Sequence, residues 1–88
     1  GSHVGSYYIR LMVLDRPGVI ADIAACLRDQ EVSVESLLQH GRRPDEAVPV
    51  VLTTHVAEED ALARALAAMD ELQAVLEMPR MIRIVNLS

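Results

Sequence analysis

Apolar and polar residues alternate along residues 7–14, a pattern that predicts a β-strand with one buried face. One face would carry Tyr7, Ile9, Leu11 and Val13, and the other Tyr8, Arg10, Met12 and Leu14. The arginine indicates that the second face is nearer to water. The apolar spacing then changes to three and four, which predicts an amphipathic helix over residues 18–30. Its apolar stripe would consist of Ile20, Ile23, Ala24 and Leu27.

Two further strands are predicted over residues 32–39 and 47–56, which are rich in aliphatic and β-branched side chains. The polar segment between them contains Gly41 and Pro44 and is short enough for a hairpin connection. Pro49 has no N–H for a ladder hydrogen bond, so we expect it near the start of its strand or at a bulge.

The last third of the chain repeats the order of helix and strand. Acidic residues 58–60 suit the positive end of a second helix. The apolar stripe of that helix would consist of Leu62, Ala65, Leu66 and Met69. A final strand is predicted over residues 75–87, interrupted at Pro79, with Ile82 and Ile84 toward the core.

The order β-α-β-β-α-β predicts an α+β, ferredoxin-like fold: one four-stranded antiparallel sheet with two helices on one face. The other face would carry Tyr8, Met12 and Leu14, together with Leu37, as an exposed apolar patch. We therefore expect that face to be covered, either in a homodimer or by the rest of a longer chain.

Length and composition limit the function. The 88 residues suffice for one domain, assigned to residues 7–88, and residues 1–6 are interpreted as a tag remnant with a flexible N-terminus. A net charge of −5 argues against nucleic acid and anionic membranes as partners. No apolar run approaches the roughly 20 residues of a membrane span. The single cysteine, Cys26, suits a reducing, cytoplasmic environment.

The four residues from Asp15 to Gly18 form the most informative motif, because they join the first strand to the first helix. Asp15 can cap the free N–H groups of the first helical turn. Pro17 presets φ for a helix start, and Gly18 allows a close approach to the backbone. N–H groups at such a turn can bind a carboxylate or phosphate. The alternative interpretation is a plain strand-to-helix turn.

Catalytic and metal-binding patterns are not evident. His40 and His55 have no acidic or thiol partner at ligand spacing, so a metal site is not predicted. Cys26 lies in mid-helix, away from any evident base, and Arg42-Arg43 is interpreted as a solvated turn. No dinucleotide-binding or nucleophile-elbow motif occurs. Gln39 offers both an amide donor and an acceptor, which could recognise a hydroxyl group; its alternative is a solvent-facing strand residue.

The segment "LDRPGVIADIAACLRDQEVSVESLLQHG", residues 14–41, resembles the ACT domain, a ligand-sensing module of amino-acid metabolism. With the following "EAVPVVLTTH", it looks like the C-terminal regulatory domain of bacterial homoserine dehydrogenase. The resemblance extends over nearly all of residues 7–87.

This resemblance implies a side-by-side dimer and an effector held between the first turn and the second strand. The effector implied is threonine, acting as a feedback inhibitor. By position, the site would be lined by Asp15, Arg16, Pro17, Gly18, Val19, Ile20, Ser36, Leu37, Leu38 and Gln39. No catalytic residue and no cofactor is implied for this fragment; an NAD(P)-dependent parent enzyme would contribute the catalytic domains. The alternatives are sensing of a branched-chain amino acid or serine, and a purely structural dimerisation role.

Overall fold

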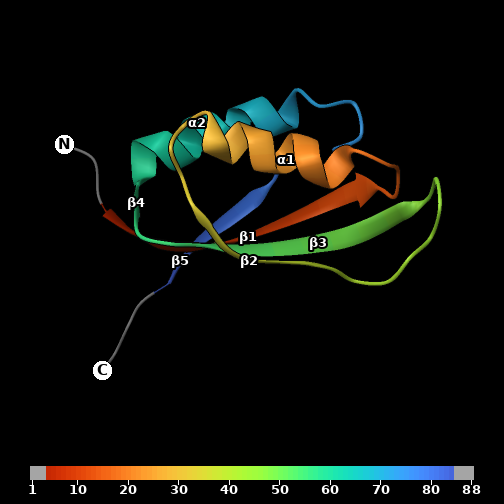
Figure 1. The fold of residues 1–88 in the computed structure, drawn as a ribbon, viewed down its shortest axis with the longest axis horizontal. Helices are drawn as coiled ribbons and strands as arrows, with labels where there is room; N and C mark the ends of the chain where they lie inside the picture. Colours follow the sequence, from red (N-terminus) through yellow and green to blue (C-terminus); the bar gives the residue numbers. More distant parts are fainter. Residues whose placement is uncertain (1–3, 85–88) are drawn as a thin grey trace.

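The fold is one antiparallel sheet with two helices against one face (Figure 1). The computed structural model describes residues 4–84. The strands are β1 (Val4–Leu14), β2 (Val34–Gln39), β3 (Ala47–Thr54), β4 (Ala57–Glu58) and β5 (Arg80–Ile84), and the helices are α1 (Val19–Arg28) and α2 (Glu59–Asp70). The predicted α+β, ferredoxin-like architecture is confirmed, with the two-residue β4 as an addition.

Strand β1 lies in the centre of the sheet. Tyr8 pairs with Thr53 of β3 and with Ile82 of β5, so these two strands lie along opposite edges of β1. Strand β2 lies beyond β3, and β4 pairs with Val4 and Gly5 at the start of β1. The two outermost long strands are therefore β2 and β5.

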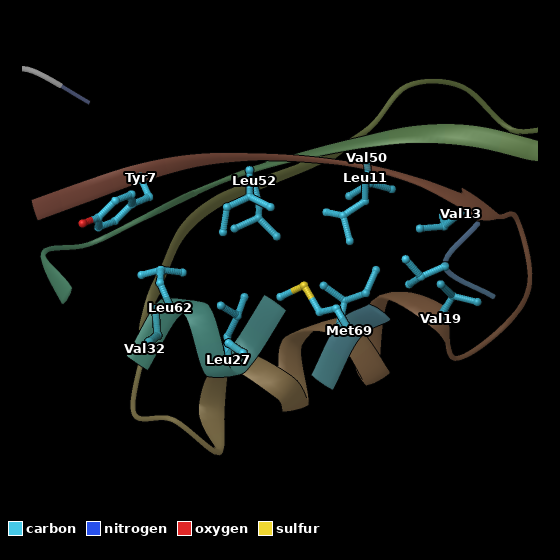
Figure 2. Packing of buried hydrophobic residues seen from close by; sticks show 14 of the residues in the cluster. Tyr7, Leu11, Val13, Val19, Leu27, Val32, Val50, Leu52, Leu62 and Met69 are labelled. Atoms are coloured by element: carbon cyan, nitrogen blue, oxygen red, sulfur yellow. The ribbon is translucent and has the colours of Figure 1, made fainter. Parts of the chain in front are cut away.

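The face of the sheet that meets the helices, called the helix-side face below, supplies most of the core. Its most buried side chains are Tyr7, Ile9, Leu11 and Val13 of β1 and Val48, Val50 and Leu52 of β3. The helices contribute Val19, Ile23 and Leu27 of α1 and Ala61, Leu62, Ala65 and Met69 of α2. Figure 2 shows the side chains of the sheet and of the helices meeting in one apolar layer. The alternation predicted for β1 is confirmed.

The opposite face of the sheet, called the open face, is not covered by either helix (Figure 1). Strand pairing places Tyr8, Arg10, Met12, Leu38, Val51, Arg80 and Ile82 on it. Leu38 and Ile82 are 57% and 63% exposed, so this face does carry apolar side chains at the surface.

Two predictions about the direction of side chains are wrong. Ile82 and Ile84 lie exposed rather than in the core, because Met81 is the β5 residue opposite the buried Ile9. Leu37 was predicted on the open face but packs against the core, and its neighbour Leu38 lies on the open face instead. Adjacent apolar residues occur in both strands, so sequence pattern alone does not determine which one points inward.

Several boundaries differ from the prediction. Strand β1 begins three residues earlier, at Val4, so part of the segment predicted to be flexible is paired; residues 1–3 lie outside the described residues. Strand β3 ends at Thr54, with Pro49 as its third residue, near the start as expected. Val75 forms only an isolated bridge with Val13, and β5 begins after the buried Pro79. Residues 85–87 of the predicted last strand lie outside the described part.

Candidate functional site

The turn between β1 and α1 presents unpaired N–H groups at the start of the helix. Gly18 is the N-cap residue of α1 and has a φ of +86°, a conformation that favours glycine. Within residues 4–84, the N–H groups of Gly18 and Ile20 donate to no other residue, whereas the N–H of Val19 donates to the carbonyl of Arg16 at 3.3 Å. The positive end of the α1 dipole is therefore open to an anion.

Asp15 does not cap α1, so that prediction is wrong. Its carboxylate accepts a hydrogen bond of 2.7 Å from the backbone N–H of Arg43 and one of 3.2 Å from Nε of Arg42. Asp15 continues the alternation of β1 onto the helix-side face and is only 9% exposed. The distant loop, rather than the neighbouring helix, satisfies the carboxylate, because the side chain points away from the first turn of α1.

These contacts keep Asp15 ionised. Its pKa is lowered from the ordinary value of 3.8, chiefly by the hydrogen bond from the N–H of Arg43. Burial acts in the opposite direction, and hydrogen bonds from the side chains of Arg42 and Gln39 lower the pKa further. The carboxylate thus ties two segments together that lie 28 residues apart.

The loop of residues 40–46 is bound to the same turn through its backbone. The N–H of Asp45 donates to the carbonyl of Asp15 at 3.0 Å, and the N–H of Asp15 donates to the carbonyl of Glu46 at 2.9 Å. Arg16 adds an ion pair with Asp45 at 3.2 Å. The interpretation of Arg42-Arg43 as a merely solvated turn missed this role. The opposite charges of Arg42 and Asp15 were an available signal, whereas Arg43 contacts Asp15 only through its backbone N–H, which residue type does not reveal.

Gln39 lies at the end of β2, next to this assembly. Its Nε2 donates to the carbonyl of Gly41 at 2.8 Å, and its side chain contributes to the lowered pKa of Asp15. Because the amide nitrogen is the group that donates to Gly41, Oε1 remains available as an acceptor. Gln39 is half-buried, so it is fixed in place yet still reachable from the surface.

The structure brings together only part of the predicted set. Leu37 and Gln39 lie on the helix-side face with the turn, although Leu37 packs into the core. Ser36 and Leu38 lie on the open face, where the hydroxyl of Ser36 is hydrogen-bonded to that of Thr53 at 2.5 Å. Among the predicted residues of the second strand, Gln39 is therefore the one whose polar group is directed to the turn.

The turn does not line any of the depressions described for this chain. Four depressions of about 240 to 360 Å³ lie elsewhere: two on or beside the open face around Arg10, one along α2, and one beside β4. Residues 15–20 line none of these four.

Other candidate chemistry is weak. Burial raises the pKa of the Cys26 thiol, and Asp29 and Asp22 raise it further, so this cysteine is a poor nucleophile at neutral pH. Among residues 4–84 no group of three or more histidine, cysteine or acidic side chains could hold a metal ion. None of the helices in that range is sufficiently long and apolar to span a membrane. The arrangement at the turn suits binding rather than proton transfer.

The sequence matches the family model of the ACT domain over residues 7–74. The chain belongs to the ACT domain family. This ACT domain is 37% identical over 82 residues to a homoserine dehydrogenase of Neisseria gonorrhoeae and 35% identical over 81 residues to that of Helicobacter pylori. The alignments cover 93% and 92% of this chain, and 19% of each relative.

A solved homoserine dehydrogenase from Thiobacillus denitrificans contains the same fold. Its TM-score to this ACT domain is 0.88 at 34% identity, over 99% of this chain and 19% of that one. The chain thus spans about a fifth of the length of the relatives it matches. The likeness extends over the turn, the loop of residues 40–46 and β5 alike.

Proposed function

We propose that this ACT domain is the amino-acid-sensing regulatory domain of a homoserine dehydrogenase, with threonine as its effector. The similarity to homoserine dehydrogenases over nearly the whole chain supports the choice of parent enzyme. The domain itself is non-catalytic in this proposal, and NAD(P)-dependent chemistry belongs to other domains of a cytoplasmic parent chain. Threonine is favoured because a feedback inhibitor is commonly an end product of its pathway.

The observation that carries the proposal is the open N-terminus of α1 beside Gln39. The N–H groups of Gly18 and Ile20 are unpaired and would bind the ligand's carboxylate. Oε1 of Gln39 would accept a hydrogen bond from the ligand's hydroxyl group. A ligand that has both a carboxylate and a nearby hydroxyl group is a hydroxylated amino acid, as opposed to a purely aliphatic one.

A second copy of the domain would complete the site. Residues 15–20 line none of the four depressions described above, which supports a ligand enclosed between two chains. Strands β2 and β5 form the edges of the sheet and offer backbone groups for pairing with another chain. We propose a side-by-side dimer, which sedimentation at micromolar concentration would show; a monomer there would contradict it.

The test is calorimetric titration of threonine and valine into the wild type and Gln39→Ala. Valine has nearly the same shape as threonine but lacks the hydroxyl group. Loss of one neutral hydrogen bond costs about 0.5–1.5 kcal/mol, so the substitution should weaken threonine binding roughly two- to tenfold. Valine binding should change far less, and discrimination between the two ligands should fall with affinity.

Valine also serves as the structural control. Gln39 holds the loop through Gly41, so Ala at this position could loosen the site in general. A general loosening would weaken both ligands equally and would leave their ratio unchanged. Unchanged threonine affinity would show that Gln39 is not the specificity group. Binding of serine or of a branched-chain amino acid in place of threonine would identify that amino acid as the effector. If no amino acid binds, a purely structural dimerisation role would replace the sensing function.

A further inference from the structure

Six of the eight arginines in the chain have a partner in the structure. Four form ion pairs with Asp or Glu: Arg16 with Asp45, Arg28 with Asp29, Arg42 with Asp15, and Arg43 with Glu46. Two hydrogen-bond to neutral oxygens: Arg64 to Gln30, and Arg83 to the carbonyl of Val4. The remaining two, Arg10 and Arg80, have no hydrogen bond or ion pair from their side chains to any residue within 4–84.

These two unpaired arginines lie directly opposite each other. Arg10 of β1 is the pairing partner of Arg80 of β5, and both side chains are on the open face. Like charges directly opposite each other on neighbouring strands destabilise a sheet. No carboxylate can relieve them from within the long strands around them, because β1, β3 and β5 contain neither Asp nor Glu. The pair therefore concentrates positive charge on a chain whose net charge is −5.

The surface around the pair is hollowed, and charged and apolar side chains line it together. A depression of about 240 Å³ is lined by both arginines, Met12 and Met78, with Glu77 at its wall but more than 4 Å from either guanidinium nitrogen. A second depression, of about 340 Å³, extends from Arg10 to Tyr8 and Val51. Two guanidinium groups that line one depression can bind one carboxylate from two sides.

We propose that the open face docks on an acidic surface of the rest of the parent protein, with a carboxylate seated between Arg10 and Arg80. This rests on the proposal that the domain is part of a homoserine dehydrogenase, and not on the identity of the effector. The relatives are about five times as long as this chain, so a parent protein of that length has other domains on which this face could dock. Exposed Ile82 and Leu38 on either side of the pair indicate a macromolecular partner with apolar contacts as well as charge.

A second copy of the same face fits less well. Two open faces brought together would place four guanidinium groups in one interface. Strands β1, β3 and β5 contain no carboxylate, so within this depression only Glu77 of each copy would oppose them. The side-by-side dimer proposed above uses the edges of the sheet and leaves the open face free for this other contact.

Arginine footprinting with phenylglyoxal, read by mass spectrometry, tests the proposal. The isolated 88-residue chain and the full-length parent protein are compared, both without effector. Arg10 and Arg80 should both be modified in the isolated chain. In the parent protein, the rate of modification of each should fall by about tenfold or more. Arg28, whose side chain is 76% exposed on α1, is the control and should react equally in both.

A variant distinguishes two causes of protection of Arg80 in the parent protein: a carboxylate held between the two arginines, and burial that does not depend on their charge. In the parent protein carrying Arg10→Ala, Arg80 should regain most of its reactivity, whereas Arg28→Ala should leave Arg80 protected. Equal reactivity of Arg80 in the isolated chain and the parent protein would overturn the proposal. So would concentration-dependent protection within the isolated chain, which would mean that a second copy covers this face. A failed threonine titration would not affect either result.

Discussion

The two faces of the sheet use the same kinds of strand residue for opposite purposes. On the helix-side face, Leu52 and Ile9 are fully buried against both helices. On the open face, Leu38 and Ile82 remain more than half exposed. Each face also has its exceptions: Asp15 and the hydroxyl of Tyr7 on the buried side, and two unpaired arginines on the exposed side. One face supplies stability, whereas the other leaves apolar and charged side chains at the surface, where we propose that a partner binds.

The largest expected difference between the faces comes from one substitution made on both. Leu52→Ala leaves a cavity in the core and should lower the free energy of unfolding by about 2–5 kcal/mol. Leu38→Ala, on the adjacent strand but exposed, should change it by no more than about 0.5 kcal/mol. Urea denaturation of both variants measures the contrast. Similar losses for the two leucines would mean that the isolated domain already buries its open face.

The second prediction concerns Asp15, the charged residue on the buried helix-side face, and the pH dependence of the stability that it confers. Its pKa is lower in the folded chain than the value of 3.8, so its contribution to stability is complete above that value. The contribution should be lost as the pH falls through the folded pKa, because protonation removes the charged acceptor of the Arg43 N–H. Melting temperatures recorded from about pH 5 down to about pH 2 should therefore fall more steeply for the wild type than for Asp15→Asn. Parallel curves would show that Asp15 contributes nothing to this dependence.

The hydroxyl of Tyr7 tests the second exception, with a smaller expected effect. Tyr7 is 1% exposed, and its hydroxyl has no hydrogen-bond partner within the described residues. Figure 2 shows its ring at one end of the core, near Leu62 and Val32. Tyr7→Phe removes an unpaired buried polar group and should raise the free energy of unfolding by about 1 kcal/mol. Tyr8→Phe, on the open face, is the matched control and should be nearly neutral; a destabilised Tyr7→Phe would reveal a partner for the hydroxyl.

The architecture could be predicted from sequence because local patterns encode it. The alternation of β1 assigns its buried face unambiguously, since an arginine interrupts only one of the two faces. The pattern was insufficient where apolar residues are adjacent, at Leu37-Leu38 and Met81-Ile82. There, the pairing of β5 with β1 and of β2 with β3 decides which side chain is buried, and pairing is a long-range property.

The candidate site shows the same limit. The turn was recognisable from Pro17 and Gly18, whose backbone preferences are local. The role of Asp15 was not, because its partners lie 27 and 28 residues away and replace the helix cap that sequence proximity suggested. The arginine pair on the open face joins residues 10 and 80, and only the sheet register brings them opposite each other.

The central claim is that the first turn of α1 holds the carboxylate of an amino acid. Titration of the ¹⁵N-labelled chain with threonine, followed by amide NMR shifts, tests it most directly. The largest shifts should occur at the N–H groups of Gly18 and Ile20 and at the side-chain amide of Gln39. Saturating threonine that leaves these three signals in place, or that shifts the amides around Arg10 and Arg80 instead, would contradict it.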